Sequence, residues 1–573
     1  MENGTYVARL EEIADLLQVT GANPFRVRAF QKAARVIDGM AEDLDTVLAE
    51  GEVTAVDGIG KSIAEDLRQI RERGSCDLLD ELRASLPDGI TDLLRVQGLG
   101  PKKVKALYEE LGIGDLDALE ARASEGRIAG LKGFGARTEE KILKEVERLR
   151  RTAGRTPLAE AWPHAERLLG LLREVSGVER AEIAGSLRRG RETVGDLDFV
   201  VASREPGPVM EAFATDGDVE EVVARGDTKT TIRLSGGLSA DVRVVPPEVF
   251  GATLHHFTGS KEHNVAIRSR ALKRGLRVSE WGVFRRDGED GGDATDGELV
   301  ACATEEDIFA AVGLPFIPPE LREDRGEIGA AEEDRLPELV TLEDIVADLH
   351  MHTTASDGRH SVARMAEAAR DRGLKRIAIT DHSRSLTVAN GLDARRLRAQ
   401  MEEIDAYNAG DPAVRVLKGL EVDILEDGAL DMDDDVLAAL DWVVGSVHQW
   451  MGQDPQTMTE RLLRAIGSGF LHALGHPTGR LVGRRDGFTF DVDAVFDACA
   501  DAGVALEVNA SPWRVDLDDR LIQRALERDR LMLTINTDAH STAELGQMHF
   551  GVRMARRGGC PRSRVVNAQD ESP

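Results

Sequence analysis

The C-terminal part of the chain contains short apolar runs, each followed closely by histidine, aspartate or glutamate. RIAIT precedes His382, WVVGSV precedes His448 and LMLTIN precedes Asp538. Strands that carry site residues at their carboxyl ends are typical of an α/β barrel or an open α/β sheet. The region 341–573, which holds 9 of the 13 histidines, is therefore expected to form such a sheet around a polar site.

The polar residues at these run ends form a set suited to metal binding. Imidazole and carboxylate groups together suit zinc, manganese or iron, and a carboxylate can bridge two ions. The candidate ligands are His350, His352, Asp357, His382, Glu421, His448, His476, Asp538 and His540. A single histidine is more often structural. That role is kept for His255, His263, His360, His472 and His549. Two interpretations, contact with substrate phosphates or mere surface cover, stay open for Arg384, Arg480 and Arg514.

Near the N-terminus a five-residue pattern occurs three times, as VDGIG (56–60), VQGLG (96–100) and LKGFG (131–135). Each copy precedes a helix-like segment, and its glycines allow a turn whose N–H groups and helix dipole can bind a phosphate without reading a base. One such turn is more often an ordinary connection, but three copies with basic residues close behind resemble helix-hairpin-helix elements that bind DNA. The candidate DNA contacts are Gly58, Gly60, Lys61, Gly98, Gly100, Lys102, Gly133 and Gly135.

A third pattern, GSLRRGRETVGDLDFVV, begins at Gly185 among short strands and helices. Residues two apart in a strand share a face, so Asp196 and Asp198 would lie side by side. Adjacent carboxylates repel unless a divalent cation lies between them, and Asp241 in ADVRVV offers a third ligand. Such a triad suits two-metal phosphoryl transfer, whereas an isolated Asp-x-Asp is more often a solvated turn. The upstream groups that can donate to a triphosphate are Gly185, Ser186 and Arg189.

Length and composition limit these interpretations. A chain of 573 residues is too long for one core, so about two to four domains are expected. The net charge of −30 argues against a nucleic-acid partner, although RVRAFQKAAR and KILKEVERLRR supply local positive charge. Four scattered cysteines predict neither disulfides nor a thiolate zinc site. The sequence has no signal-peptide pattern and no long apolar run, which predicts a cytoplasmic protein without a membrane segment.

The order GSLRRG, GDLD, ADVR and FTGSKEHN (257–264) resembles the family X DNA polymerases, the DNA polymerase beta group. The resemblance extends over residues 1–318 and includes NPFRVRAFQKAARVI near the N-terminus. It implies that Asp196, Asp198 and Asp241 are catalytic and hold two magnesium or manganese ions. The residues that it places around the nucleotide are Gly185, Ser186, Arg189, Gly195, His256, Phe257, Gly259 and Asn264. It places Arg268 near the template.

The ligand order HxH, DG, DH, E, H, H and DxH resembles the PHP (polymerase and histidinol phosphatase) domain, a distorted β/α barrel. This resemblance implies that the nine candidate ligands hold three ions of manganese, zinc or iron. Beside a family X polymerase, such a domain is expected to act as a 3′→5′ exonuclease and 3′-end phosphoesterase. The implied partners are dNTPs and gapped or nicked double-stranded DNA, bound by a monomer that works in base-excision repair.

These patterns predict a multidomain chain with α-helical helix-hairpin-helix domains, an α/β nucleotidyltransferase palm, an α+β nucleotide-binding subdomain and the distorted barrel. The expected boundaries are 1–88 and 89–155 for the two helical domains, 156–250 for the palm, 251–318 for the nucleotide-binding subdomain, 319–340 for a linker and 341–573 for the PHP domain.

Two positions depart from the polymerase pattern. His256 stands where many relatives carry tyrosine, which leaves ribose discrimination open. Asp66 stands where lyase members carry the Schiff-base lysine, and a carboxylate cannot form an imine, so lyase chemistry is not expected unless Lys61 substitutes. Two other functions stay open: a DNA-binding repair scaffold with an inactive polymerase centre, and a barrel that acts as a small-molecule phosphatase.

Overall fold

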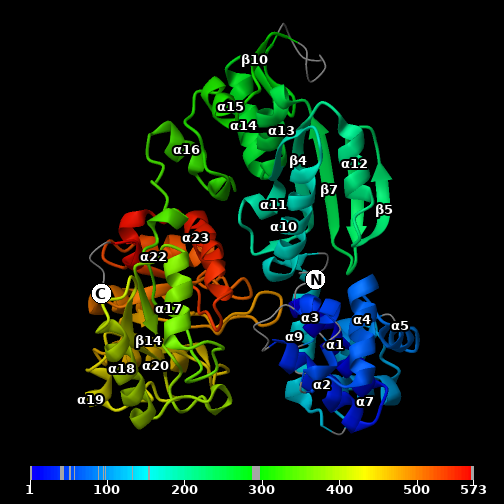
Figure 1. Cartoon of the computed structure of the whole chain (residues 1–573). Coiled ribbons are helices and arrows are strands. Elements are labelled where there is room, and N and C mark those ends of the chain that lie inside the picture. The colour runs from blue at the N-terminus through cyan, green and yellow to red at the C-terminus, as the bar shows by residue number, and fades with distance from the viewer. Residues whose placement is uncertain are drawn as a thin grey trace. The chain divides into compact units, whose positions relative to one another are not determined.

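A computed structural model of the chain describes residues 3–38, 44–50, 53–56, 58–87, 89–94, 96, 99–131, 133–151, 155–286 and 297–569. The chain divides into two compact units, residues 1–153 and 154–573, whose elements are labelled in Figure 1. Within the described ranges, no helix combines the length and apolar character needed to cross a bilayer.

The first unit is helical throughout its described part. Its helices are α1 (Asn3–Val19), α2 (Pro24–Asp38), α3 (Leu44–Glu50), α4 (Lys61–Arg73), α5 (Asp77–Ala84), α6 (Ile90–Leu94), α7 (Pro101–Leu111), α8 (Leu116–Ser124) and α9 (Ala136–Arg151), with a 3₁₀ turn η1 (Val53–Ala55). Helix α1 packs against α2, α5 and α7. Buried apolar residues from Tyr6 to Val146 form one core, so both predicted helical domains contribute to the same interior.

The second unit begins with a five-stranded mixed sheet in the order β2-β4-β7-β6-β5. Its strands are β2 (Val178–Ile183), β4 (Asp196–Ser203), β5 (Val219–Arg225), β6 (Lys229–Leu234) and β7 (Ser239–Val245), with the short pair β1 (Thr156–Pro157) and β3 (Thr193–Val194) beside it. Helices α10 (Leu158–Glu174) and α12 (Pro206–Ala214) pack on this sheet, and the single turn α11 (Gly185–Arg188) leads into it. The β4–β7 pair is parallel and all other pairs in the sheet are antiparallel.

A small α+β region follows the mixed sheet. It contains η2 (Pro247–Val249), α13 (Phe250–Thr258), α14 (Lys261–Lys273), β8 (Leu276–Ser279), β9 (Gly282–Arg285), β10 (Leu299–Ala301), α15 (Glu305–Ala311), η3 (Pro319–Leu321) and α16 (Glu327–Glu332). The last two elements lie in the segment predicted as a linker. Arg322 of that segment is fully buried, and its guanidinium donates to Glu305 at 2.5 Å and lies over the ring of Phe309. The segment is therefore packed against the region before it.

The C-terminal region is a parallel seven-stranded sheet in strict sequence order. Its strands are β11 (Ala347–Asp348), β12 (Arg376–Ile379), β13 (Arg415–Asp423), β14 (Trp442–Ser446), β15 (Ala473–Leu474), β16 (Ala505–Asn509) and β17 (Leu533–Asn536). A parallel bridge between Met351 and Ala539, just beyond β11 and β17, connects the two edges and nearly closes the sheet. The predicted distorted barrel is confirmed.

Helices and short turns surround this barrel (Figure 1). They are η4 (Leu342–Asp344), α17 (Val362–Asp371), η5 (Thr387–Ala389), α18 (Ala394–Asn408), α19 (Asp434–Leu437), α20 (Pro455–Ile466), α21 (Val492–Ala502), α22 (Asp519–Leu526), η6 (Glu544–Gln547), α23 (Met548–Arg557), η7 (Arg562–Arg564) and η8 (Val566–Ala568). An aspartate side chain accepts from the first-turn backbone of each of α18, α20, α21 and α22, which fixes where these helices begin.

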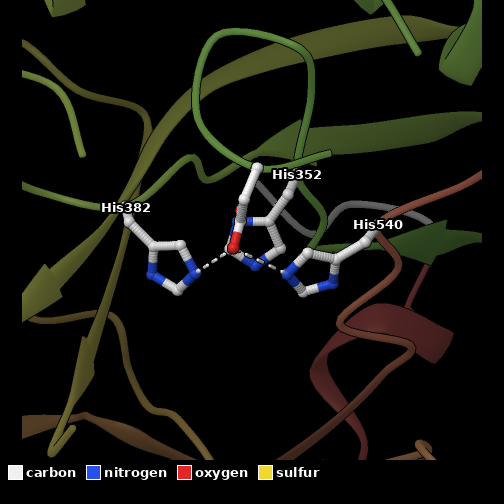
Figure 2. Close-up of side chains that lie close together, drawn as sticks. His352, His382 and His540 are labelled. Carbon is white, nitrogen blue, oxygen red and sulfur yellow. Dashed lines mark ion pairs between the residues drawn. The ribbon is translucent and has the colours of Figure 1, made fainter. Parts of the chain in front are cut away.

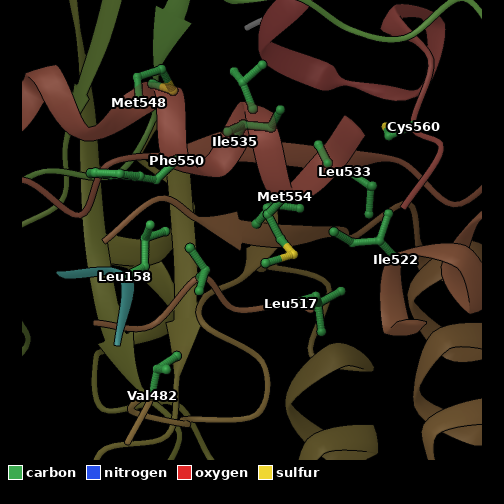
Figure 3. Packing of buried hydrophobic residues seen from close by; sticks show 14 of the residues in the cluster. Leu158, Val482, Leu517, Ile522, Leu533, Ile535, Met548, Phe550, Met554 and Cys560 are labelled. Carbon is green, nitrogen blue, oxygen red and sulfur yellow. The ribbon is translucent and has the colours of Figure 1, made fainter. Parts of the chain in front are cut away.

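The mixed sheet and the barrel share one apolar core. Figure 3 shows Leu158, the first residue of α10, among barrel residues that include Val482 and Phe550. The indole of Trp162, one turn further along α10, lies 5.3 Å from the ring of Phe550 on α23. Residues 154–573 therefore form one packed unit rather than two domains joined only by a connecting segment.

Candidate active sites

A histidine and carboxylate cluster lies at the carboxyl ends of the barrel strands. His382 follows β12, Glu421 lies in β13 and His448 follows β14, and the remaining candidates follow β11, β15 and β17. Because all seven strands are parallel, these ends meet at one rim of the barrel. Figure 2 shows the rings of His352, His382 and His540 directed toward one another. Every histidine among the predicted ligands lies within 4 Å of a carboxylate oxygen of Glu421, Asp357 or Asp538.

Glu421 occupies the centre of this cluster. One of its carboxylate oxygens lies 2.7 Å from His382 Nδ1, and the other lies 3.0 Å from His476 Nε2 and 3.3 Å from His448 Nε2. Its side chain is fully buried. A buried carboxylate that faces several imidazoles has the position of a bridging metal ligand.

Two aspartates surround the same histidines from the other side. Asp357 lies 3.6 Å from His382 and 3.5 Å from His540, and Asp538 lies 3.0 Å from His352. Three groups of ligand atoms within the described part of the chain are close enough to hold an ion. They are His352, Asp357, His382 and His540; His350, His352 and Asp538; and His382, Glu421 and His448.

Buried imidazole nitrogens in the cluster, among them Nε2 of His350 and Nδ1 of His352, lack a hydrogen-bond partner among the described residues. Buried polar atoms without partners are costly, and a bound cation would satisfy them through their lone pairs. Imidazole and carboxylate donors suit manganese, zinc or iron. The residues present therefore fit the metal centre that the sequence predicts.

The histidines of the cluster have shifted pKa values. Burial opposes the charged imidazolium, but Glu421 and Asp423 raise the pKa of His448 to about 9, and Asp357 and Asp538 raise the pKa of His540 to about 9. Burial, His540 and His382 lower the pKa of His352 to about 4. At pH 7.5 the imidazoles of His448 and His540 are thus positively charged, and that of His352 is neutral.

These protonation states predict proton release on metal binding. The pKa of His350 also lies well above its usual value, since Glu507 and Asp538 outweigh burial. We expect about two protons, from His448 and His540, to leave when the site is filled at pH 7.5, because a ligand nitrogen must be unprotonated. Calorimetric titration of metal in buffers of different ionisation enthalpy measures the number. As pH falls below 9 the apparent metal affinity should decrease. Release of fewer than one proton would contradict these assignments.

A carboxylate triad lies on the mixed sheet. Asp196 and Asp198 share one face of β4, and the parallel register pairs Asp198 directly with Asp241 of β7. Burial, followed by repulsion from Asp196 and Asp241, raises the pKa of Asp198 to about 7. Lys229 of β6 lies 2.7 Å from Asp241. Three converging carboxylates, of which Asp241 is paired with Lys229, match the expected divalent metal site.

Gly185 is required beside this triad. Its φ is +60°, and a Cβ atom at this position would lie 2.0 Å from a carboxylate oxygen of Asp198. Any side chain would therefore displace Asp198, and an L-residue would be strained in this backbone conformation. The turn that precedes β4 thus brings its backbone into direct contact with the carboxylates.

The chain matches known families along most of its length. Residues 1–76 match a helix-hairpin-helix domain and residues 90–148 a SAM-like helix-hairpin-helix tandem, while 253–323 match the DNA polymerase beta thumb and 348–511 the PHP domain. The DNA polymerase/3′-5′ exonuclease PolX of Bacillus subtilis (strain 168) is 40% identical over 572 residues, which cover 99% of this chain and 98% of that protein. The chain belongs to the PolX family. This membership confirms the predicted architecture of helix-hairpin-helix, polymerase and PHP domains.

Two shorter relatives carry other names. A probable phosphatase of Enterobacter sp. (strain 638) is 29% identical over 230 residues, 38% of this chain and 89% of that protein. A probable phosphatase of Photobacterium profundum is 28% identical over 236 residues, 40% of this chain and 91% of that protein. Their lengths correspond to that of the PHP region.

The residues expected around the nucleotide lie in the turn before β4 and along α13 and α14. Arg189 donates to Glu323 at 3.1 Å and to the carbonyl of Thr258, so its guanidinium is engaged within the protein. Ser186 lies in α11, and Gly195 directly precedes Asp196. The amide of Asn264 donates to the carbonyl of His256 at 2.7 Å. Of the remaining candidates, Phe257 lies under the guanidinium of Arg243, Gly259 ends α13, and Arg268 donates to the carbonyl of Asn264.

The three glycine turns in the helical unit have the same hydrogen-bond pattern. In each copy the fourth residue donates to the carbonyl of the first: Ile59 to Val56, Leu99 to Val96 and Phe134 to Leu131. Gly60 and Gly100 are the N-caps of α4 and α7, and no side chain caps either helix. Lys61 and Lys102 are exposed beside these N-termini, Gly133 and Gly135 lie before α9, and Gly98 falls outside the described residues. Helix N-termini without a side-chain cap offer N–H groups to phosphates.

The three arginines left open by the sequence differ in position. Arg514 lines a pocket of about 260 Å³ with His448, His476 and Asp538, and its Nε lies 3.7 Å from Asp538. Arg480 points away from the cluster and donates to the carbonyl of Arg514. Arg384 is exposed and pairs with Asp431. Only Arg514 is placed to contact a phosphate in this pocket.

The five histidines given structural roles lie outside the metal groups formed by the described residues. His263 contacts Glu327 at 2.7 Å, His472 accepts from the backbone of Val443, and His360 accepts from that of Thr542. The rings of His255 and His549 pack against Phe309 and Phe550.

Two carboxylates that the sequence patterns did not single out lie behind the metal ligands. Glu507 accepts from His350 Nδ1 at 2.7 Å, and Asp423 accepts from His448 Nδ1 at 2.7 Å. A carboxylate on the far nitrogen fixes the tautomer and orientation of a ligand imidazole. A charged residue inside an apolar strand such as ALEVN is the signal that could have identified Glu507.

We expect Glu507→Gln to weaken metal binding in the barrel about 10- to 100-fold, because the neutral amide orients His350 less firmly. Competition between the protein and a chromophoric chelator measures the affinity. Glu402→Gln, which changes an exposed residue of α18, is the control and should bind metal as the unchanged protein does. Equal affinities for the two variants would show that Glu507 has no such role.

Proposed function

We propose that this chain fills short gaps in duplex DNA and hydrolyses phosphodiester bonds at 3′ ends, at two separate centres. Polymerisation is supported best by the β4–β7 register, which pairs Asp198 with Asp241 in a chain 40% identical to the Bacillus subtilis PolX. Hydrolysis is supported by the histidine and carboxylate cluster at the barrel rim. Base-excision repair as the setting, a monomeric state and the domain boundaries stay predictions.

At the polymerase centre, Asp196, Asp198 and Asp241 would hold two magnesium or manganese ions. When bound, such ions lower the pKa of the primer hydroxyl and neutralise charge on the triphosphate. Ser186 and the backbone of Gly185 and Gly195 would bind the triphosphate, together with Arg189 once it leaves Glu323. The sugar and base of the dNTP would then contact His256, Phe257, Gly259 and Asn264. Template and gap would be held by Arg268 and the helix-hairpin-helix turns.

At the barrel centre, the nine predicted ligands would hold manganese, zinc or iron. Bound there, the ions supply an activated hydroxide and polarise the phosphoryl oxygen. Arg514 would bind a phosphate oxygen, because it is the arginine that lines the pocket. A pocket of about 260 Å³ is small, which favours a single chain end over a duplex as substrate.

A second candidate function for the barrel is hydrolysis of a small phosphate ester. The similarity to probable phosphatases of about the same length as the barrel favours it. Turnover of histidinol phosphate and of a 3′-recessed primer by the full chain separates the two possibilities. Faster turnover of the small ester would support the phosphatase.

One gel assay tests both proposed activities. The full chain is incubated with a gapped duplex that carries a labelled primer, in magnesium or manganese, with dNTPs present or omitted. Extension with dNTPs and shortening without them are expected. A chain that binds the duplex but neither extends nor shortens the primer would be a scaffold instead.

A further inference from the structure

The turn that carries the expected triphosphate groups is held by arginines of the barrel. Arg553 of α23 donates to the carbonyl of Leu187 at 2.7 Å and to that of Arg188 at 3.0 Å. Arg557, one helical turn further on, donates to the carbonyl of Arg189 at 2.6 Å. The three carbonyls at the end of the Gly185–Arg189 turn are thus bound by a helix more than 350 residues away in the sequence.

These contacts add to the hydrogen bonds of a short turn. Helix α11 has only four residues, and the carbonyl of Leu187 accepts from the backbone N–H of Gly190 at 3.0 Å, so the arginines supply further donors to the carbonyls at its end. Gly190 follows with a φ of +72°, and a Cβ atom there would lie 3.3 Å from Cδ of Arg557. A third barrel arginine, Arg480, reaches Glu192 at 3.0 Å just before β3. The segment between the expected triphosphate donors and Asp196 therefore contacts the barrel at Gly190 and Glu192.

An ion-pair chain connects the same helix to Arg189. One carboxylate oxygen of Glu323 lies 3.1 Å from Arg189 Nε and 3.0 Å from Arg557 Nη1. Arg557 is 2% exposed, and its other nitrogen lies 2.7 Å from Asp519. Arg191 is a third cation near Glu323, at 3.9 Å. Glu323 therefore keeps a buried partner when Arg189 turns away from it.

We propose that Arg557, together with Arg553, is a positioning residue for nucleotide binding at the polymerase centre. A buried carboxylate left without a cation is costly. Because Arg557 stays on Glu323, Arg189 can exchange this carboxylate for the triphosphate at lower cost. Without Arg557, Glu323 would hold Arg189 more firmly and the turn would lose a donor, and both effects weaken triphosphate binding. This inference rests on the proposed polymerase function.

Arg557→Ala in the full chain tests the inference. For single-nucleotide gap filling we expect the KM for dNTP to rise about tenfold with kcat within about twofold, as for a residue that acts through another group. Affinity for the gapped duplex and the rate of 3′-end hydrolysis should not change. Arg557→Lys, which keeps one cation, should recover part of the KM. Arg553→Ala should act in the same direction and serves as the second variant if Arg557→Ala does not fold.

Arg556→Ala is the matched control. Arg556 lies on the same helix but donates to Glu320 and to the carbonyl of Val340, not to the turn. An equal rise in KM for Arg556→Ala would assign the effect to general loosening and overturn the inference, as would an unchanged KM in folded Arg557→Ala and Arg553→Ala. Calorimetric binding of dNTP with Ca²⁺, without DNA, is measured in parallel. A chain that binds dNTP but fills no gap would refute the proposed function, and the binding data would still test Arg557.

Discussion

We expect Asp198→Ala to abolish gap filling while 3′-end hydrolysis continues at its usual rate. Asp198 lies between Asp196 on its own strand and Asp241 on the next, so its loss removes the central carboxylate of the three that would hold the expected ions. A fall on the order of 10³-fold, equivalent to about 4 kcal/mol, is expected for the loss of metal-assisted chemistry. Single-turnover incorporation into a one-nucleotide gap measures it.

The pH dependence of the unchanged protein provides a second measure of the same site. Burial and the neighbouring carboxylates raise the pKa of Asp198 to about 7, so below pH 7 a metal ion must displace a proton. The apparent affinity of the site for the metal ion should then fall about tenfold for each pH unit below 7 and level off above pH 7.

Asp216→Ala, which removes a carboxylate paired with Arg167, is the control for Asp198→Ala. Gap filling by Asp198→Ala at the control rate would refute the assignment of the triad.

The second large effect is expected for Glu421→Gln in the barrel. This carboxylate contacts His382, His448 and His476, and although burial alone would raise its pKa, His382, His448 and His350 hold that pKa well below its usual range. A neutral amide removes the central charge, so hydrolysis of a labelled 3′ end should fall on the order of 10³-fold while gap filling is retained. The metal content of the purified variant, by elemental analysis, should fall as well.

Glu426→Gln is the comparison for this variant. Glu426 is exposed three residues beyond the end of β13, so its loss should change neither metal content nor hydrolysis. If Glu421→Gln shortened a primer as fast as Glu426→Gln, the barrel cluster would not be the hydrolytic centre. Loss of gap filling in Glu421→Gln would indicate instead that the substitution disturbs the whole unit.

The sequence contained enough to predict both clusters, because each depends on simple periodicity. Parallel strands bring their carboxyl ends together, so ligands at the ends of RIAIT and WVVGSV had to meet once the barrel was inferred. Residues two apart in a strand share one face, so Asp196 was expected beside Asp198. Asp241 was offered as a third ligand, but its approach to Asp198 depends on strand pairing across more than forty residues, which periodicity alone does not give.

Features that depend on side-chain direction could not be predicted. Arg480 and Arg514 each follow a candidate ligand motif, yet one binds backbone carbonyls and the other lines the pocket. The polar segment 319–340 suggested an interdomain linker. Arg322 within it is buried, because Glu305 and the rings of Phe309 and Phe316 provide a site for a guanidinium that local composition does not reveal.

The core shared by α10 and the barrel limits how this protein can be divided for experiments. Leu158 and Trp162 lie against barrel side chains, so a fragment that stops before the barrel would expose an apolar surface to solvent. Such a fragment would tend to self-associate, and low activity in it would report poor solution behaviour rather than chemistry. Point variants within the intact chain avoid this confusion.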